Sequence, residues 1–311
     1  VVAVAGDPRD AMTFYFGACA GGVWKTTNGG LAWTPVSDSI GVGSIGAVAA
    51  APSNGDVVWV GSGEANNMRS SSWGVGVFKS TDGGKTWSKP MLPKSQHIGR
   101  IVIDPRDPDI VYVAAMGPLW APGGERGLFK TIDGGKTWTN TKSISAQTGF
   151  TELVMDPANP DVLYAASLQR ERREYGFLPG GTESAIWKTT DGAKTWTKLA
   201  GGLPTGEIGR IGLTVCRSRP STVYASVHAK AAANGLYRSD DAGSTWKLVN
   251  SSNGTAVSAP PAMSSASVTA GRPKSPSGRD NSQPSATGVR MMVSTSSPVT
   301  ASTAANLRTR P

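Results

Sequence analysis

The sequence predicts an all-β fold built from repeated four-stranded sheets, and three observations support this prediction. A motif of the form Ser/Thr-x-Asp-x-Gly-x-Thr-Trp occurs five times, at Thr26–Trp33, Ser80–Trp87, Thr131–Trp138, Thr189–Trp196 and Ser239–Trp246. A hairpin-like segment precedes each copy. The 311 residues include 39 glycines and 10 tryptophans, which suits a chain with many tight turns. A unit of about fifty residues copied in series indicates a repeat architecture.

Each repeat contains four strand-like segments in the same order. In Ile98–Ala115, two apolar runs flank an Asp/Pro turn, which is the sequence form of a hairpin. A third run, such as Leu128–Lys130, ends in an aromatic and a basic residue, and the fourth begins at the tryptophan of the motif. Similar hairpins occur at Phe150–Ser167 and Ile208–Val227, with looser copies at Val1–Ala18 and Ile45–Ser62. Four strands per unit are typical of a β-propeller blade.

The repeats predict two regions. Residues 1–250 form five blades, and we interpret them as a partial ring because an open propeller leaves strand edges unpaired. Residues 251–311 consist mainly of Ser, Thr, Ala and Pro and contain no Phe, Trp or Tyr. Such a composition cannot bury enough apolar surface to offset the entropy of ordering, so we expect this tail to be disordered. A frameshifted or artificially joined end would have this composition, and so would a natural Ser/Thr/Pro-rich linker.

Composition argues against several classes of function. The net charge of +9 is concentrated in the tail and forms no basic stripe, so we expect no nucleic-acid partner. The chain contains two cysteines and two histidines without metal-ligand spacing, which predicts no metal and no cofactor. No apolar run reaches 18 residues, and no signal-peptide pattern opens the chain, so we expect no direct membrane insertion.

The repeated motif resembles the Asp box of bacterial neuraminidase repeats. The segment Gly61–Trp87, together with Ile98–Gly117, is similar to bacterial proteins with a sortilin-type N-terminal propeller, which are often labelled glycosyl hydrolases. This resemblance covers residues 1–250. It implies a larger ring whose missing blades are partners of this chain, and a periplasmic or secreted location. The first box departs from the pattern at Asn28 and Ala32, and the fourth at Ala193, so we expect these boxes to be held less tightly.

The acidic position of each box is predicted to be structural. A short carboxylate in a glycine-rich turn can accept backbone N–H groups and close the hairpin, while the tryptophan packs between blades. One carboxylate per blade also cannot supply the pair of acids that glycoside cleavage requires. The residues assigned this structural role are Asn28, Asp82, Asp133, Asp191 and Asp241.

The predicted ligand-binding surface is the loop face, defined by the connections between second and third strands and between successive blades. The second-to-third-strand loops are long and differ from one another, and function tends to sit on variable loops held by a rigid frame. They are Gly63–Gly76, Gly117–Gly127, Gln169–Ala185 and Ala229–Gly235. The candidates are Glu64, Asn66, Asn67, Arg69, Trp73, Arg100, Trp120, Glu125, Arg126, Arg170, Arg172, Tyr175 and Arg210. No catalytic residue is assigned.

Carboxylates, arginines and aromatic rings together suit a sugar, an anionic ligand or a peptide terminus. Structural roles remain open beside this interpretation, because Arg170–Glu174 would also suit a solvated surface cluster and Glu64–Asn67 a self-bonded loop. His97 is expected to be a turn residue rather than a catalytic base.

The leading hypothesis is a non-enzymatic, extracytoplasmic binding propeller for a peptide, protein or glycan. The alternative is a glycoside hydrolase or lyase acting on an extracellular polysaccharide, and a third option is an assembly factor for membrane complexes. The sialidase opening motif and the tandem-propeller layout of xyloglucanases are not legible in the chain. Convergence of Glu64 and Glu125 on one cleft would favour the hydrolase; a face with only arginines and aromatics would favour binding.

Overall fold

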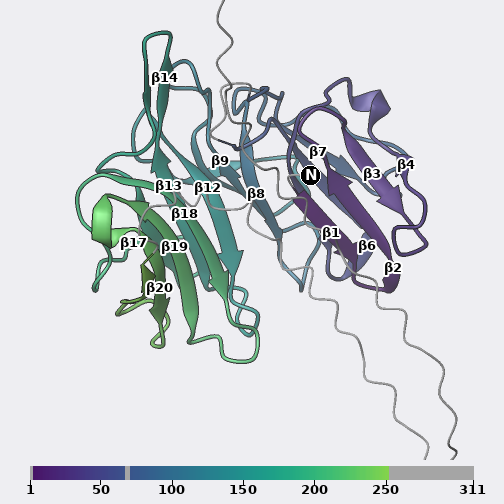
Figure 1. Cartoon of the computed structure of the whole chain (residues 1–311). Helices are drawn as coiled ribbons and strands as arrows, with labels where there is room; N and C mark the ends of the chain where they lie inside the picture. Colours follow the sequence, from purple (N-terminus) through teal and green to yellow (C-terminus); the bar gives the residue numbers. More distant parts are fainter. Residues whose placement is uncertain (1–2, 67–70, 252–311) are drawn as a thin grey trace, which may run out of the picture. The chain divides into compact units, whose positions relative to one another are not determined.

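The computed structural model describes residues 3–66 and 71–251, and within them the chain forms strands and two short 3-10 helices, η1 (Asp38–Ile40) and η2 (Ala231–Ala233). The strands form five successive antiparallel sheets and one added hairpin. Figure 1 shows these sheets following one another along the chain. The predicted all-β propeller of about five blades is confirmed at the level of fold class. Residues 252–311, for which we expect disorder, lie outside the described residues.

In four of the five blades the strands pair in the four-stranded order that the repeats predict. The first blade contains β1 (Ala3–Asp7), β2 (Asp10–Gly17), β3 (Val23–Thr26) and β4 (Thr34–Pro35). The third contains β8 (Ile98–Ile103), β9 (Val111–Ala115), β10 (Gly127–Thr131) and β11 (Thr139–Lys142). The fourth contains β12 (Thr148–Met155), β13 (Leu163–Gln169), β16 (Ala185–Thr189) and β17 (Thr197–Lys198). The fifth contains β18 (Ile208–Val215), β19 (Val223–Ala229), β20 (Gly235–Ser239) and β21 (Lys247–Ser251).

The second blade differs from the prediction because only three strands pair: β5 (Ile45–Ala51), β6 (Asn54–Ser62) and β7 (Val77–Ser80). The segment after its Asp box still runs beside β7, where Ser88 N–H donates to the Lys79 carbonyl. An isolated bridge then joins Val77 to Met91. Between these two contacts lies Pro90, which has no N–H to donate to a ladder, so a regular fourth strand is interrupted.

Loop 169–185 also differs from a simple connection, because it contains a hairpin of β14 (Glu171–Arg173) and β15 (Gly176–Leu178). Figure 1 shows β14 projecting beyond the end of the fourth blade. The hairpin therefore adds a raised element to the loop face.

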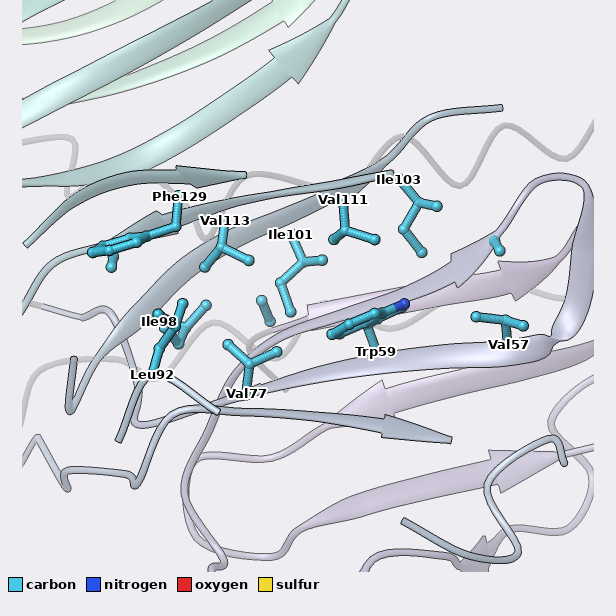
Figure 2. Packing of buried hydrophobic residues seen from close by; sticks show 13 residues of the cluster. Val57, Trp59, Val77, Leu92, Ile98, Ile101, Ile103, Val111, Val113 and Phe129 are labelled. Atoms are coloured by element: carbon cyan, nitrogen blue, oxygen red, sulfur yellow. The ribbon is translucent and has the colours of Figure 1, made fainter. Parts of the chain in front are cut away.

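The hydrophobic core is divided into separate layers, one between each pair of neighbouring blades. The layer between the second and third blades includes Val57, Trp59, Ile101 and Val113, whose side chains face one another in Figure 2. Comparable layers lie between blades one and two, three and four, and four and five. The removal of apolar surface from water is the main driving force for folding, and each blade buries its apolar surface against its neighbours. Each blade therefore depends on its neighbours for stability.

The first strands of successive blades contact one another in order, from β1 through β5, β8 and β12 to β18. They therefore line the inner side of the array, as the innermost strands of a propeller do. Within the described residues, no helix is long and apolar enough to cross a membrane.

The Asp boxes close the turns between third and fourth strands through a repeated set of hydrogen bonds. In the third blade, Asp133 Oδ1 accepts the Thr137 N–H at 2.9 Å, and Asp133 Oδ2 accepts the Thr137 hydroxyl at 2.6 Å. The Thr131 hydroxyl donates to Asp133 and accepts the Gly135 N–H. These hydrogen bonds, led by the one from the Thr137 hydroxyl, lower the pKa of Asp133. In the first box, Asn28 Oδ1 accepts the Thr26 hydroxyl and the Ala32 N–H, but the second hydrogen bond from the last position of the pattern is missing because Ala32 has no hydroxyl.

Candidate functional site

The loop face holds most of the predicted binding residues, but they fall into an inner group near the first strands and an outer group on the projecting loops. The inner group contains Glu64, Asn66, Arg100, Arg170 and Arg210. The predicted residues Asn67 and Arg69 lie outside the described residues.

Glu64 is a buried residue, 5% exposed, whose carboxylate organises its own loop. One oxygen accepts the Ser72 N–H at 3.0 Å, and the other accepts the side-chain amide of Asn66 at 3.2 Å. The Glu64 carbonyl accepts a hydrogen bond of 2.9 Å from His97 Nδ1. A carbonyl oxygen can only accept, so the neutral His97 ring carries its proton on Nδ1. Burial, followed by the charge of Arg170, lowers the pKa of His97 to about 4. His97 is thus a buried residue in the connection before β8, and its ring helps to hold the Glu64 loop in place.

Two arginines from distant blades hold the segment that follows Glu64. Arg170, at the end of β13, donates to the Asn66 carbonyl at 3.0 Å, and Arg210 in β18 donates to the Ala65 carbonyl at 2.8 Å. Arg170 is 4% exposed, and burial lowers its pKa to about 9, so it remains charged at neutral pH. Hydrogen bonds from charged donors are stronger than neutral ones, so these contacts hold the loop of the second blade against the fourth and fifth blades.

An acid that the sequence did not single out completes the inner group. Glu152 in β12 is 3% exposed, and one of its oxygens lies 3.3 Å from Arg100 Nε as an ion pair without hydrogen-bond geometry. Burial raises the pKa of Glu152, while the charges of Arg100 and Arg210 oppose that rise. Together with Asn66, these side chains line a cavity of about 20 Å³, enough for one water molecule. The presence of an acid on the first strand of the fourth blade could have identified Glu152 from the sequence. Its partners, however, come from other blades.

Arg126 is also turned inward, and its guanidinium holds the loop of the third blade. It donates to the carbonyls of Gly123 at 2.9 Å and Met116 at 2.5 Å, and also to Pro118 and Ala121. Burial lowers the pKa of Arg126 to about 10. The neighbouring Glu125 accepts the Lys94 N–H at 2.7 Å, which ties this loop to the connection before β8.

The outer group is a cluster of aromatic and arginine side chains, which we call the aromatic platform: Trp120, Arg172, Arg173, Tyr175 and Phe177. The Arg172 guanidinium carbon lies 5.7 Å from the Trp120 ring centre and 4.6 Å from that of Phe177. Trp120 is 53% exposed and Tyr175 is 83% exposed. Arg172 N–H also donates to the Leu119 carbonyl, which joins the hairpin to the loop that bears Trp120. The structure thus brings Trp120, Arg172 and Tyr175 onto neighbouring loops, while Trp73 is exposed on the loop of the second blade.

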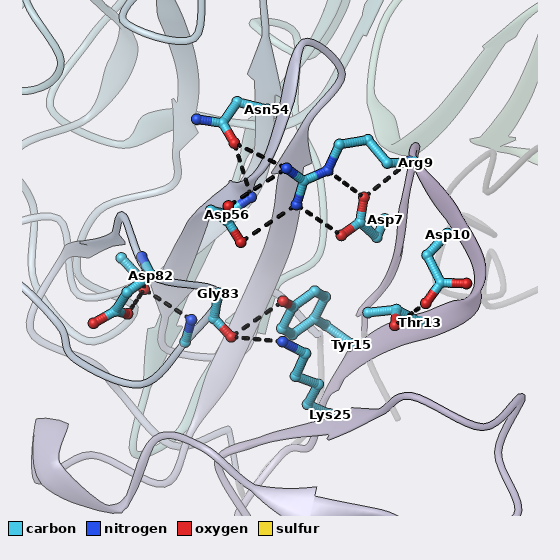
Figure 3. Close-up of polar contacts among 12 residues, drawn as sticks. Asp7, Arg9, Asp10, Thr13, Tyr15, Lys25, Asn54, Asp56, Asp82 and Gly83 are labelled. Carbon is cyan, nitrogen blue, oxygen red and sulfur yellow. Dashed lines mark hydrogen bonds and ion pairs between the residues drawn. The ribbon is translucent and has the colours of Figure 1, made fainter.

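A hollow of about 640 Å³ lies at the opposite end of the inner strands from the loop face. It is lined by the later parts of the first strands and the turns that follow them. Asp7, Arg9 and Asp10 lie on its wall, and Figure 3 shows Arg9 between Asp7 and Asp56. The sequence analysis assigned no role to this end, because its turns are short and repetitive. Among the described residues, no three or more His, Cys, Asp and Glu side chains gather where they could hold a metal ion.

These features define a repeat protein of the β-propeller class, with Asp boxes in the turns and a loop face rich in arginine and aromatic residues. The family described as "Sortilin, neurotensin receptor 3" matches residues 76–234, just over half of the chain. The chain therefore belongs to this family.

The curated proteins that the chain resembles include xyloglucanases. A xyloglucanase of Paenibacillus sp. is 27% identical over 271 residues, which cover 79% of this chain and 24% of that protein. The oligoxyloglucan-reducing end-specific xyloglucanase of Emericella nidulans is 29% identical over 220 residues, covering 55% of this chain and 27% of that protein. The chain spans about a quarter of the length of these relatives.

Solved structures give the same fold. The GH74 enzyme of Niastella koreensis has a TM-score of 0.59 at 22% identity and covers 80% of this chain and 38% of its own. An ancestral GH74 enzyme has a TM-score of 0.60 at 21% identity and covers 81% of this chain and 33% of its own. At these identities the likeness shows the fold alone.

Proposed function

We propose that this chain is part of an extracytoplasmic glycoside hydrolase, and that it contributes a glycan-binding surface for a polysaccharide such as xyloglucan. The observation that carries the proposal is the similarity to xyloglucanases across 79% of the chain. This reverses the order of the two leading hypotheses from the sequence, in which non-enzymatic binding stood first. The extracytoplasmic location belongs to the proposal, since a polysaccharide too large to enter a cell is met outside it.

The aromatic platform is the surface that we assign to the glycan. The faces of a sugar ring present C–H groups that pack against an aromatic ring, while hydroxyls at the ring edge require hydrogen-bond donors and acceptors. Trp120 offers an exposed ring, and the stacked Arg172 offers N–H donors beside it. Because Arg172 stacks on Trp120 and its backbone N–H donates to the Leu119 carbonyl, the hairpin and the Trp120 loop are held together before a ligand arrives, which reduces the entropy lost on binding.

We assign no catalytic role to the acids of the loop face. Glycoside cleavage requires two carboxyl groups flanking one bond, roughly 5 to 10 Å apart. Glu64 is buried and accepts hydrogen bonds from its own loop, and Glu125 accepts the Lys94 N–H. Since the chain spans about a quarter of its curated relatives, the proposed hydrolase takes its acid pair from elsewhere in the full protein.

A second candidate is a binding propeller without hydrolysis, for a peptide, protein or glycan. The observation that favours it is the same engagement of Glu64 and Glu125 in loop hydrogen bonds. The two candidates share the aromatic platform and differ in whether a bound polysaccharide is cleaved.

The test is the binding of xyloglucan oligosaccharides to the full chain, measured by isothermal titration calorimetry. Trp120→Ala is expected to weaken binding about tenfold, which corresponds to about 1.4 kcal/mol. Leu31→Ala is the matched control, because Leu31 is 88% exposed but lies in the first Asp box. Equal binding by Trp120→Ala and the parent would contradict the assignment of the platform. Selective binding of peptides on a mixed glycan and peptide array would favour the second candidate.

A further inference from the structure

Arg172 differs from the other arginines of the loop face in how its guanidinium is held. Those arginines either donate to backbone carbonyls or pair with an acid of the protein. They are Arg100, Arg126, Arg170, Arg173 and Arg210. Within residues 3–66 and 71–251, the half-buried Arg172 side chain makes neither contact and lies against two aromatic rings instead.

The backbone and the two rings fix where this guanidinium lies. Arg172 pairs with Phe177 across the hairpin of β14 and β15, and β14 projects beyond the fourth blade in Figure 1. Its backbone N–H donates to the Leu119 carbonyl at 3.2 Å. The guanidinium carbon lies 4.6 Å from the Phe177 ring centre and 5.7 Å from that of Trp120.

These ring contacts leave the donors of Arg172 for another group. A cation–ring contact is an electrostatic attraction to the ring face and supplies no oxygen that accepts an N–H. A guanidinium is planar and presents its N–H groups as a fork, which matches the two oxygens of a carboxylate. Because the fork is already positioned, less freedom is lost when such a group binds.

The acids near Arg172 are engaged elsewhere. Glu171 pairs with Arg173 at 2.6 Å, on the same hairpin. Glu125 accepts a backbone N–H of the connection before β8 at 2.7 Å. Glu174, in the turn of the hairpin, forms no ion pair with Arg172 among the described residues. The charge of Arg172 therefore has no counter-charge in the part of the chain that the structure describes.

Other guanidiniums lie close enough to Arg172 to act together with it. Burial is the first cause that lowers the pKa of Arg170 to about 9, and the charges of three arginines lower it further. In decreasing order of effect, these are Arg210, Arg126 and Arg172. Cations grouped in this way repel one another, so an anion that binds beside Arg172 is attracted by the group as well as by one side chain.

We propose that Arg172 makes the aromatic platform a site for an acidic glycan, in which a carboxylate substituent pairs with Arg172 while a neighbouring sugar ring packs on Trp120. This inference rests on the proposed function, because it assigns a charge to the glycan that the platform binds. A neutral glycan uses the ring of Trp120 and leaves the charge of Arg172 unmatched. A glycan with a carboxylate matches both.

The test compares two forms of one ligand. Xyloglucan oligosaccharides are used as the neutral form. The acidic form is made by oxidising their primary hydroxyls to carboxylates and separating the singly charged species by anion exchange. Binding to the full chain is measured by isothermal titration calorimetry at about 20 mM and about 300 mM sodium chloride. The acidic form is expected to bind about threefold to tenfold more tightly at the lower salt concentration, and this preference is expected to shrink at the higher one.

Three variants identify the source of the preference. Arg172→Gln is expected to remove it, and Arg172→Lys to keep only part of it, because lysine retains the charge without the fork. Lys94→Gln is the matched control, since it removes one exposed charge from the same face, and it is expected to keep most of the preference. Melting temperatures of all variants verify that they are folded.

The outcomes separate this inference from the proposed function. Equal binding of both forms by the parent would overturn the inference and leave glycan binding intact, whereas binding of neither form would overturn both. If Arg172→Gln weakens both forms equally, Arg172 serves only to hold the platform and the inference is wrong. An equal loss of preference in Lys94→Gln and Arg172→Gln would assign it to the general field of the face, which also contradicts the inference.

Should Arg172→Gln fail to fold, the parent alone still decides. A preference for the acidic form that does not change between the two salt concentrations does not come from a partly exposed charge, and it would overturn the role given to Arg172.

Discussion

Arg210 in the fifth blade donates a hydrogen bond of 2.8 Å to the backbone carbonyl of Ala65, although the two residues are 145 positions apart. Ala65 lies on the loop of the second blade, so this contact joins non-neighbouring blades beside the inner strands. Arg170 makes a parallel contact with Asn66 from the fourth blade. The loop that carries Glu64 is therefore shaped by two other blades as well as by its own hydrogen bonds.

Replacing Arg170 with Leu is expected to destabilise the fold by about 1.5 to 3 kcal/mol, because it removes a charge-assisted hydrogen bond at a site that is 4% exposed. Urea unfolding followed by tryptophan fluorescence provides the measurement. Arg173→Leu is the control, since the Arg173 side chain is 55% exposed and pairs with Glu171 on the projecting hairpin. An equal loss of stability in both variants would show that Arg170 does not hold the loop.

The hydroxyl of Tyr164 contributes to the connection between the fourth and fifth blades, since it donates to the Ala242 carbonyl at 3.0 Å. Tyr164→Phe is expected to cost about 0.5 to 1.5 kcal/mol. Tyr112→Phe provides a close comparison, because Tyr112 occupies the equivalent position. Ala242 accepts from both Tyr164 and Lys188, whereas the contact with Gly192 is made by Lys130. We expect a smaller loss for Tyr112→Phe in the same urea experiment. The reverse order would contradict the role given to the Tyr164 hydroxyl.

The repeat pattern predicts the blades well because the same physical constraints recur in each copy. The Asp boxes at Asp82, Asp133, Asp191 and Asp241 make matching hydrogen bonds, so one interpretation covers all four. The prediction fails where a blade departs from the repeat. Pro90 interrupts the expected fourth strand of the second blade.

The hairpin β14–β15 also lies outside the repeat pattern. Its sequence is rich in Arg and Glu, and its two strands are only three residues each, too short to show an alternating apolar pattern.

The inner part of the loop face could be predicted only in outline. The sequence indicates that Glu64, Arg126 and Arg170 share a face, because they lie on equivalent loops. It does not indicate whether each side chain points outward or folds back. Arg126 folds back onto four carbonyls of its own loop, and the buried position of Glu152 depends on Arg100 and Arg210 from neighbouring blades. Such contacts between distant segments have no local sequence signal.

Removing the carboxylate of an Asp box is expected to loosen its blade without selectively removing glycan binding. Asp133→Ala loses two hydrogen bonds to Thr137 and is expected to lower the melting temperature, whereas Asp133→Asn, which resembles the natural first box at Asn28, should lower it less. Differential scanning fluorimetry and calorimetric binding of the same samples provide the measurements. Loss of binding with an unchanged melting temperature would show that the box acts in recognition rather than in folding.

Stability is expected to fall between about pH 6.5 and pH 4 because of His97. Burial lowers the pKa of this histidine from 6.5 to about 4 in the folded chain, so in that range the unfolded chain binds more protons than the folded one. Stability therefore rises with pH across this window, and the stabilisation lost on acidification is about 3 kcal/mol. The Asp boxes contribute to the loss of stability at still lower pH, since hydrogen bonds lower the pKa of Asp133 from 3.8 in the folded chain.

Urea unfolding at pH 7.5, 6, 5 and 4.2 measures this effect, and His97→Gln separates it from other groups. Glutamine can still donate to the Glu64 carbonyl but does not titrate, so its stability should change much less over the same range. Glu152, whose pKa is raised by burial, acts in the opposite direction, because its protonation in the folded chain favours folding as the pH falls. If the parent and His97→Gln lose stability equally between pH 6.5 and 4, the buried histidine is not the origin of the pH dependence.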